Sequence, residues 1–307
     1  MDRRIIKLLI LCVVLIAACG KPQEQGLEKS RLNIVTTTGM IEDAVMNIVG
    51  DSADVISLMG PGVDPHLYKA TQGDLQRLTS ADVIFYNGLH LEGKMGEVLE
   101  KLSRIKPVIA VAEDINPEKL RKVPEFNNNY DPHIWFDVAL WTEAVRKTGE
   151  ALQDLDSARA DFYRTNTQAY VGQLDSLHKW VKDEISTIPK AQRTLITAHD
   201  AFGYFGDAYD IEVRGLQGIS TLSEYGLRDV SHLVTFIVDR KIKAVFVETS
   251  VSEKAINAVV EGARKRGFDV KIGGNLYSDA MGKKGTKEGT YIGMVTANVN
   301  TIVEALK

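Results

Sequence analysis

The sequence predicts an α/β protein with two lobes, each built on a four-stranded, mainly parallel sheet flanked by helices, and one long helix that joins them. Two patterns lead to this prediction. Short runs rich in β-branched residues alternate with helical patterns along most of the chain, which is typical of a parallel sheet covered by helices. One long apolar stripe with helical spacing interrupts the alternation near the middle. The length of 307 residues is sufficient for two domains.

Residues 1–18 have the features of a lipoprotein signal peptide. A basic start precedes an apolar run at residues 8–17, which is too short to span a bilayer comfortably. The run ends in LIAACG, which resembles the lipobox of bacterial lipoproteins, where the chain is cut before the cysteine and its thiol carries a diacylglycerol. We therefore expect lipid attachment at Cys19, followed by a polar tether at residues 19–30. The alternative is an ordinary secretory signal with a chance cysteine.

Residues 31–155 are predicted to form the first lobe. Its expected strands are residues 32–37, 53–58, 82–87 and 107–112, and its expected helices cover residues 41–49, a segment beginning at residue 74, and residues 96–102. Residues 113–130 have no clear period and contain three consecutive asparagines, so we expect a surface loop there.

Residues 156–188 are predicted to form the linking helix. Apolar and aromatic positions recur at spacings of three and four from Phe162 to Ile188, and Pro189 ends the pattern. At about 1.5 Å per residue, such a helix would be on the order of 45 Å long, which exceeds the width of one lobe. A coiled-coil seam is the alternative, but a single segment of this kind favours an intramolecular spine that limits the lobes to small relative motions.

Residues 189–307 are predicted to form the second lobe, in which the alternation of strands and helices resumes. The expected strands are residues 194–197, 211–214, 244–248 and 270–272, and the expected helices are residues 227–239, 253–266 and 291–306.

The tripeptide Asp-Pro-His occurs twice, at residues 64–66 and 131–133. Proline fixes its own φ near about −65° and biases the preceding residue toward extended backbone, so each copy presents its histidine from a stiff loop. A single histidine of this kind would more often be structural. Two in matching frames favour a shared site, and a metal is the first candidate because imidazole is the commonest metal ligand.

Polar residues that follow predicted strands extend this candidate site. In open α/β sheets, ligands bind beyond the carboxyl ends of the strands. This rule selects His66, His199 and Asp279, and His133 joins them from its rigid loop. Two residues come from each lobe, so the four can meet only in the cleft between the lobes. Three imidazoles and a carboxylate suit a divalent first-row metal ion.

The chain resembles the metal-binding lipoproteins of bacterial ABC importers for zinc and manganese, most closely the TroA type, over essentially the whole mature length. The segments that carry the resemblance are TTTGMIEDAV, LMGPGVDPHLY, YNGLHLEGKM, DPHIWFD, TAHDAFGYF, GLQGIS, GGNLYSDAMG and EGTYIGMV. The resemblance implies His66, His133, His199 and Asp279 as the metal ligands. It also implies that Zn²⁺ or Mn²⁺ is bound as cargo by a lipid-anchored, extracytoplasmic protein, expected to be a monomer, and delivered to a membrane permease.

The choice between the two ions depends on the ligand types. Imidazole suits zinc better than manganese, and members of the resembled family regarded as manganese-specific tend to carry glutamate at the position of His199. Members with the present ligand set are associated with both ions. Many zinc-uptake members also carry a long His-rich loop, whereas residues 113–130 contain no histidine. Histidine ligands further predict that affinity falls as the pH drops through about 6.5.

Other polar and aromatic residues are expected to support the site or the fold without binding the ion. His90 and Glu92 follow a strand and could either hydrogen-bond a ligand or serve the structure alone. We expect His178 and His232 to be packed or solvated, and Glu224 and Glu248 to cap or pair rather than bind. The residues expected to wall the cleft and exclude water are Tyr68, Trp135 and Phe202.

Three other functions fit the sequence less well than ion capture. A zinc-dependent hydrolase would need an open water position and a base such as Asp200 or Glu92, but a fourth protein ligand fills the sphere and no His-Glu-x-x-His pattern occurs. A binding protein for a chelated metal or vitamin would need a wide cleft lined by aromatics and arginines, and only Arg214 lies close to a strand end. An adhesin lacks support because no repeat or stalk is present.

Nucleic acid is excluded as an expected partner. The formal net charge is −4, and the sequence contains no sustained basic run. Because a fourth protein ligand also leaves no position open for water, we expect a protein that binds an ion and is not an enzyme.

Overall fold

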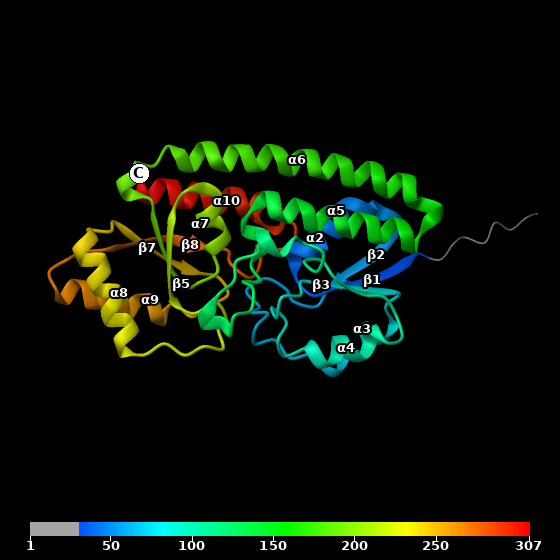
Figure 1. Ribbon diagram of the computed structural model, residues 1–307, viewed down its shortest axis with the longest axis horizontal. Helices are drawn as coiled ribbons and strands as arrows, with labels where there is room; N and C mark the ends of the chain where they lie inside the picture. The colour runs from blue at the N-terminus through cyan, green and yellow to red at the C-terminus, as the bar shows by residue number, and fades with distance from the viewer. Residues whose placement is uncertain (1–30) are drawn as a thin grey trace, which may run out of the picture. The chain divides into compact units, whose positions relative to one another are not determined.

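The first lobe contains the four parallel strands that the sequence predicts. The computed structural model describes residues 31–307, so the signal peptide, Cys19 and the tether lie outside the described residues. The strands lie in the spatial order β2-β1-β3-β4 (Figure 1). Their bounds are β1 (Leu32–Thr36), β2 (Ala53–Ser57), β3 (Val83–Tyr86) and β4 (Val108–Ala110).

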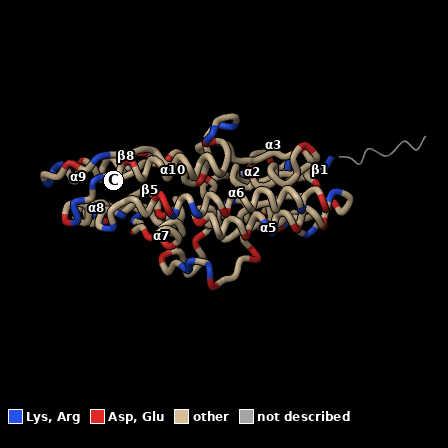
Figure 2. The backbone as a smooth tube through the Cα atoms, turned by 90° about the horizontal axis from the view of Figure 1, so that it is seen from above, with Lys and Arg blue, Asp and Glu red and all other residues tan. Residues whose placement is uncertain are grey.

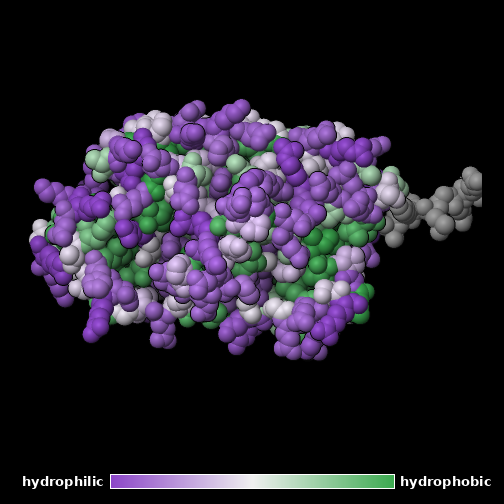
Figure 3. All heavy atoms as spheres, in the orientation of Figure 1, coloured by the Kyte–Doolittle hydropathy of each residue, from purple (hydrophilic) through white to green (hydrophobic). Residues whose placement is uncertain are grey.

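Helices cover both faces of this sheet because successive strand residues point in opposite directions. Ile34 of β1 packs into the apolar cluster that includes α2 (Gly39–Val49). Its neighbour Val35 packs into a separate cluster with α3 (Gln72–Ser80) and α4 (Gly96–Ser103). The outer surfaces of the helices are largely hydrophilic on the face that Figure 3 displays.

The second lobe also contains four strands, which form two parallel pairs. β5 (Thr194–His199) pairs with β6 (Glu212–Gln217), and β7 (Ala244–Glu248) pairs with β8 (Lys271–Leu276). β5 and β7 lie side by side. At their carboxyl ends the backbone N–H of His199 donates to the Glu248 side chain (2.9 Å), where a continuous ladder would supply a backbone carbonyl.

The remaining helices of the second lobe agree with the sequence, with one addition. α8 (Leu227–Arg240), α9 (Lys254–Lys265) and α10 (Tyr291–Leu306) were predicted. The short helix α7 (Gly203–Tyr209) was not predicted, because it has only seven residues and they show no clear period.

The predicted linking helix is present, but it is one arm of a helix pair. α6 (Ala160–Ser186) is about 40 Å long at 1.5 Å per residue and follows the short 3₁₀ turn η5 (Ser157–Arg159). α5 (Val138–Leu155), for which no element was predicted, packs antiparallel along α6 (Figure 1). Close approach of the two helices requires a glycine, since a Cβ at Gly149 would lie 2.3 Å from Thr167 Oγ1.

The buried stripe of α6 begins one residue later than the sequence pattern indicates. Phe162 was expected in the stripe, yet it is 47% exposed, whereas Tyr163 is fully buried. The reason is local hydrogen bonding, because the Tyr163 hydroxyl donates to Asp156 (3.2 Å) and accepts from Ser52 (3.2 Å). From Tyr170 onward the predicted positions are buried.

One continuous apolar cluster connects the two lobes. It contains Ile34 and Phe85 of the first sheet, Leu174 of α6, and Leu195 and Phe246 of the second lobe. Residues 32–307 accordingly form one compact unit. Within residues 31–307, no helix is long and apolar enough to cross a membrane.

Charged residues are distributed over the described chain without a segregated basic face. Figure 2 shows Lys and Arg interspersed with Asp and Glu along the helices and loops.

Candidate metal centre

The two Asp-Pro-His tripeptides fold into the same local turn. In the first, the backbone N–H of His66 donates to Asp64 Oδ1 at 2.9 Å. In the second, the backbone N–H of His133 donates to Asp131 Oδ1, also at 2.9 Å. An aspartate that accepts from the backbone two residues later forms a compact turn, and the intervening proline restricts it further. The matching sequence frames therefore share the same hydrogen bond from the histidine backbone to the aspartate side chain.

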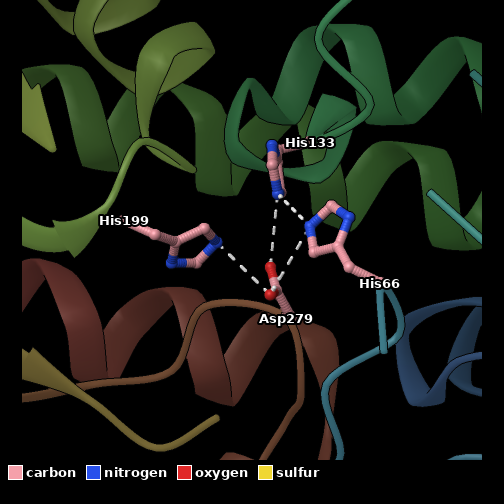
Figure 4. Close-up of side chains that lie close together, drawn as sticks. All are labelled: His66, His133, His199 and Asp279. Carbon is pink, nitrogen blue, oxygen red and sulfur yellow. Dashed lines mark hydrogen bonds and ion pairs between the residues drawn. The ribbon is translucent and has the colours of Figure 1, made fainter. Parts of the chain in front are cut away.

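Four side chains from distant parts of the chain meet at one point (Figure 4). His66 follows β2, His133 precedes the 3₁₀ turn η4 (Ile134–Phe136), His199 ends β5, and Asp279 follows β8. All four are buried, with exposures of 2% or less. The strand-end rule thus selected residues that the structure brings together.

The potential donor atoms of the cluster all lie within 4.8 Å of one another. The Nε2 atoms of His66 and His133 are 3.3 Å apart. Asp279 Oδ1 lies 3.4 Å from His133 Nε2, and Asp279 Oδ2 lies 3.3 Å from His199 Nε2 and 3.9 Å from His66 Nε2. Each imidazole therefore presents its Nε2 to the same small space.

Several buried polar atoms in this space lack a hydrogen-bond partner among residues 31–307. Both carboxylate oxygens of Asp279 are in this state, and so is His199 Nε2. Buried polar atoms are almost always hydrogen-bonded, so an unpartnered group calls for an explanation. A cation held between the imidazoles and the carboxylate would satisfy these atoms together, and the donor types suit a divalent first-row ion.

Two further carboxylates lie beside the Nδ1 atoms of His133 and His199. Asp131 Oδ1 lies 2.7 Å from His133 Nδ1, and Glu248 Oε2 lies 2.5 Å from His199 Nδ1. A carboxylate at Nδ1 fixes the orientation of the ring and directs Nε2 toward the centre. Glu248 pairs rather than joins the cluster, as the sequence analysis expected. The role of Asp131 was missed, although its position two residues before His133 is the available signal.

Burial and neighbouring charges shift the pKa values of the three imidazoles in different directions. Burial lowers the pKa of His66 to about 3. Burial also opposes the charged form of His133, but Asp131 and Asp279 outweigh it and raise the pKa to about 9. For His199, burial is likewise outweighed by Glu248 and Asp279, which raise its pKa well above the usual value.

Asp279, the carboxylate of the cluster, stays ionised because the neighbouring imidazoles lower its pKa. Burial favours the neutral form of Asp279, yet the His199 and His133 imidazoles hold its pKa well below the usual range. A negative charge is therefore available at the centre when a cation arrives.

Glu92 and His90 lie outside the cluster. Glu92 is buried and accepts from Thr37 Oγ1 and from the Asn87 backbone, each at 2.7 Å. The Asn87 side chain in turn donates to the carbonyl of Pro132 (3.0 Å), immediately before His133. Glu92 thus stiffens the loop that presents a cluster residue. His90 is exposed, with its ring edge toward Phe126.

Trp135 is buried beside His133 of the cluster, and Phe202 is buried against Phe136. Trp135 stacks edge-on with His133 and donates from Nε1 to the carbonyl of Ser278 (3.0 Å). Tyr68 packs against the apolar cluster that includes Val35, and its hydroxyl donates to Asp74 Oδ2 (2.7 Å) at the start of α3, so its place in the cleft wall stays a prediction. The remaining histidines are remote from the cluster: His178 packs against Tyr209, and His232 is exposed.

Comparison with known proteins gives matches over nearly the whole described chain. The ZnuA family, described as zinc-uptake complex component A, periplasmic, matches residues 34–305. The chain is 53% identical to the manganese-binding lipoprotein MntA of Bacillus subtilis (strain 168), over 95% of both chains. It is 50% identical to the zinc-binding protein TroA of Treponema pallidum (strain Nichols), over 94% of this chain and 90% of the relative.

A solved structure shows the same fold. The periplasmic zinc-binding protein TroA from Treponema pallidum superposes with a TM-score of 0.88 at 49% sequence identity, covering 90% of this chain and 99% of that one. The chain belongs to the ZnuA family of metal-uptake components.

Proposed function

We propose that this protein captures Zn²⁺ or Mn²⁺ outside the cytoplasm and delivers the ion to the membrane permease of an ABC importer. The observation that carries the proposal is the buried convergence of three imidazoles and one carboxylate with unpartnered atoms. The relatives support it, because one is named a manganese-binding lipoprotein and another a zinc-binding protein. In this proposal the chain acts as a monomer, anchored by a lipid at Cys19.

His66, His133, His199 and Asp279 are the proposed ligands. Zinc–nitrogen bonds are about 2.0–2.1 Å long, so neighbouring ligands of a tetrahedral ion lie roughly 3.3 Å apart. Three of the distances within the cluster are 3.3, 3.4 and 3.3 Å. Only small movements would be needed to seat an ion. The first lobe (residues 31–155) supplies two ligands, and the second lobe (residues 189–307) supplies two across the linking helix (residues 156–188).

Capture is a better account of the cluster than hydrolysis. A catalytic zinc keeps a position open for water and substrate, usually beside a general base. Here four protein ligands surround the point, and all of them are buried. The oxygens of Glu92, one of the two bases considered, already accept hydrogen bonds from Thr37, Asn87 and Gly88.

Elemental analysis of the purified protein tests the proposed function. We expect one zinc or manganese ion per chain, and a protein that retains neither ion when supplied with excess would contradict the proposal. Competition of Zn²⁺ against Mn²⁺ then measures the preference. We expect His199→Glu to shift it toward Mn²⁺, because a carboxylate oxygen is the harder ligand.

Replacing Glu248 by glutamine tests whether the carboxylate behind His199 supports binding. We expect Zn²⁺ affinity to fall by roughly 10- to 100-fold, the usual cost of losing such a hydrogen-bond partner. Chelator competition measures the affinity. The matched control is Glu304→Gln, the same change at an exposed position of α10. Equal affinities for both variants and the unaltered protein would show that Glu248 does not orient His199.

A further inference from the structure

The two sides of the metal centre are joined in different ways. On one side Trp135 donates to the carbonyl of Ser278 (3.0 Å), and the Tyr291 hydroxyl donates to the carbonyl of Trp135 (2.7 Å). Both bonds are buried; the first ties the loop of His133 to the residue before Asp279, and the second ties it to the start of α10. His133 and Asp279 therefore belong to one rigid frame.

On the other side, a loop extends from the second lobe toward His66. Residues 218–226, here called the strap, contain no helix or strand, and residues 222–226 are exposed. The strap begins directly after Gln217, which pairs with His199 in the β5–β6 ladder. The Gln217 side chain also donates to the carbonyls of Thr221 (2.6 Å) and Ser223 (2.5 Å). The fold of the strap is thus set by a neighbour of His199.

The strap reaches the first lobe through one short hydrogen bond. Thr221 Oγ1 donates to Asp64 Oδ2 at 2.6 Å. The other oxygen of the same carboxylate accepts from the His66 backbone at 2.9 Å. Here the two tripeptides differ, because Asp131 holds its own imidazole. Asp64 instead connects the turn of His66 to the strap beside His199.

A surface pocket lies between the strap and His66. It has a volume of about 160 Å³ and is lined by His66 together with Ser220 and Leu222 of the strap. His90 and Phe126 contribute to its other walls. The pocket therefore leads from the surface to a buried residue of the cluster, with the strap as one side of the passage.

We propose that the strap gates the exchange of the ion at His66, and that the Thr221–Asp64 hydrogen bond is the latch that holds it closed. This inference rests on the proposed function. When the latch opens, the strap can move away from His66 while the Trp135–Ser278 side stays joined. Thr221 and Asp64 are thus positioning residues that control rates of ion exchange, and neither contacts the ion.

The test replaces Thr221 by valine, which removes the hydroxyl and keeps the branched shape. Stopped-flow mixing with Zn²⁺ measures the association rate, and excess fluorescent chelator measures the dissociation rate. A latch stabilises the closed strap with or without the ion, so its loss increases opening equally in both states. We expect both rates to rise by roughly three- to tenfold, the factor that corresponds to the net free energy of one hydrogen bond. Kd should stay unchanged, because opening becomes easier to the same extent in the ion-free and ion-bound states.

The Thr221→Ser variant is the matched control, because it retains the donor and should keep the rates of the unaltered protein. Unchanged rates in Thr221→Val would overturn the latch. A weaker Kd arising from faster dissociation alone would also overturn it, since that result indicates misplacement of His66. If the unaltered protein bound neither Zn²⁺ nor Mn²⁺, the proposed function itself would fail, and the latch with it.

Discussion

Replacing Asp279 by asparagine is expected to weaken Zn²⁺ binding by roughly a hundredfold to a thousandfold. Asparagine has the same shape, but it removes a carboxylate whose two oxygens have no hydrogen-bond partner among residues 31–307. Zinc sites built from four ligands have binding free energies of about 10–16 kcal/mol, so each ligand accounts for roughly 3–4 kcal/mol. Chelator competition at fixed pH measures the loss.

The control for this variant is Asp239→Asn, the same chemical change at an exposed position in α8. It should bind Zn²⁺ like the unaltered protein. Circular dichroism of both variants establishes that they are folded. A folded Asp279→Asn protein with unaltered affinity would remove Asp279 from the ligand set and leave three imidazoles.

The second large effect is the dependence of affinity on pH. With pKa values of about 9 for His133 and well above the usual value for His199, both imidazoles carry a proton at pH 7 in the ion-free protein. An ion that binds their Nε2 atoms must displace both protons. His66, with a pKa of about 3, is already neutral and releases none. Falling pH thus favours the protonated, ion-free form, and rising pH favours binding.

We expect the affinity for Zn²⁺ to rise by up to about two powers of ten per pH unit between pH 7 and 8. Calorimetry at pH 7 in two buffers with different ionisation enthalpies should show about two protons released per ion. The rise should become shallower above about pH 9, where His133 loses its proton without the ion. Constant affinity and no proton release would mean that neutral histidines already occupy the site.

This pH range lies above the one expected from the sequence alone. A reference pKa near 6.5 placed the loss of affinity around that pH. The structure moves the transition upward because Asp131 and Glu248 lie behind two of the imidazoles. Neither partnership could be inferred from spacing alone. Glu248 ends β7 and meets His199 only because β5 and β7 are neighbours.

The strands and the candidate ligands were predictable because both depend on local patterns. Runs of β-branched residues predicted the strands β1 to β8, and the strand-end rule selected His66, His199 and Asp279. α5 was missed because its buried surface is broad, with Leu140, Trp141 and Thr142 buried in succession. Such a surface hides the helical period. The shifted stripe of α6 depends on contacts with Ser52 and Asp156, which the spacing of apolar residues does not record.

The continuous core has a consequence for how the protein resists unfolding. The largest apolar cluster contains side chains from both lobes, whereas the separate apolar cluster of each lobe is smaller. We therefore infer that the described chain unfolds as one cooperative unit. An ion bound only by the folded form then stabilises both lobes together, by an amount that grows with free ion concentration. The loaded protein would consequently expose its chain to proteases less often than the empty one.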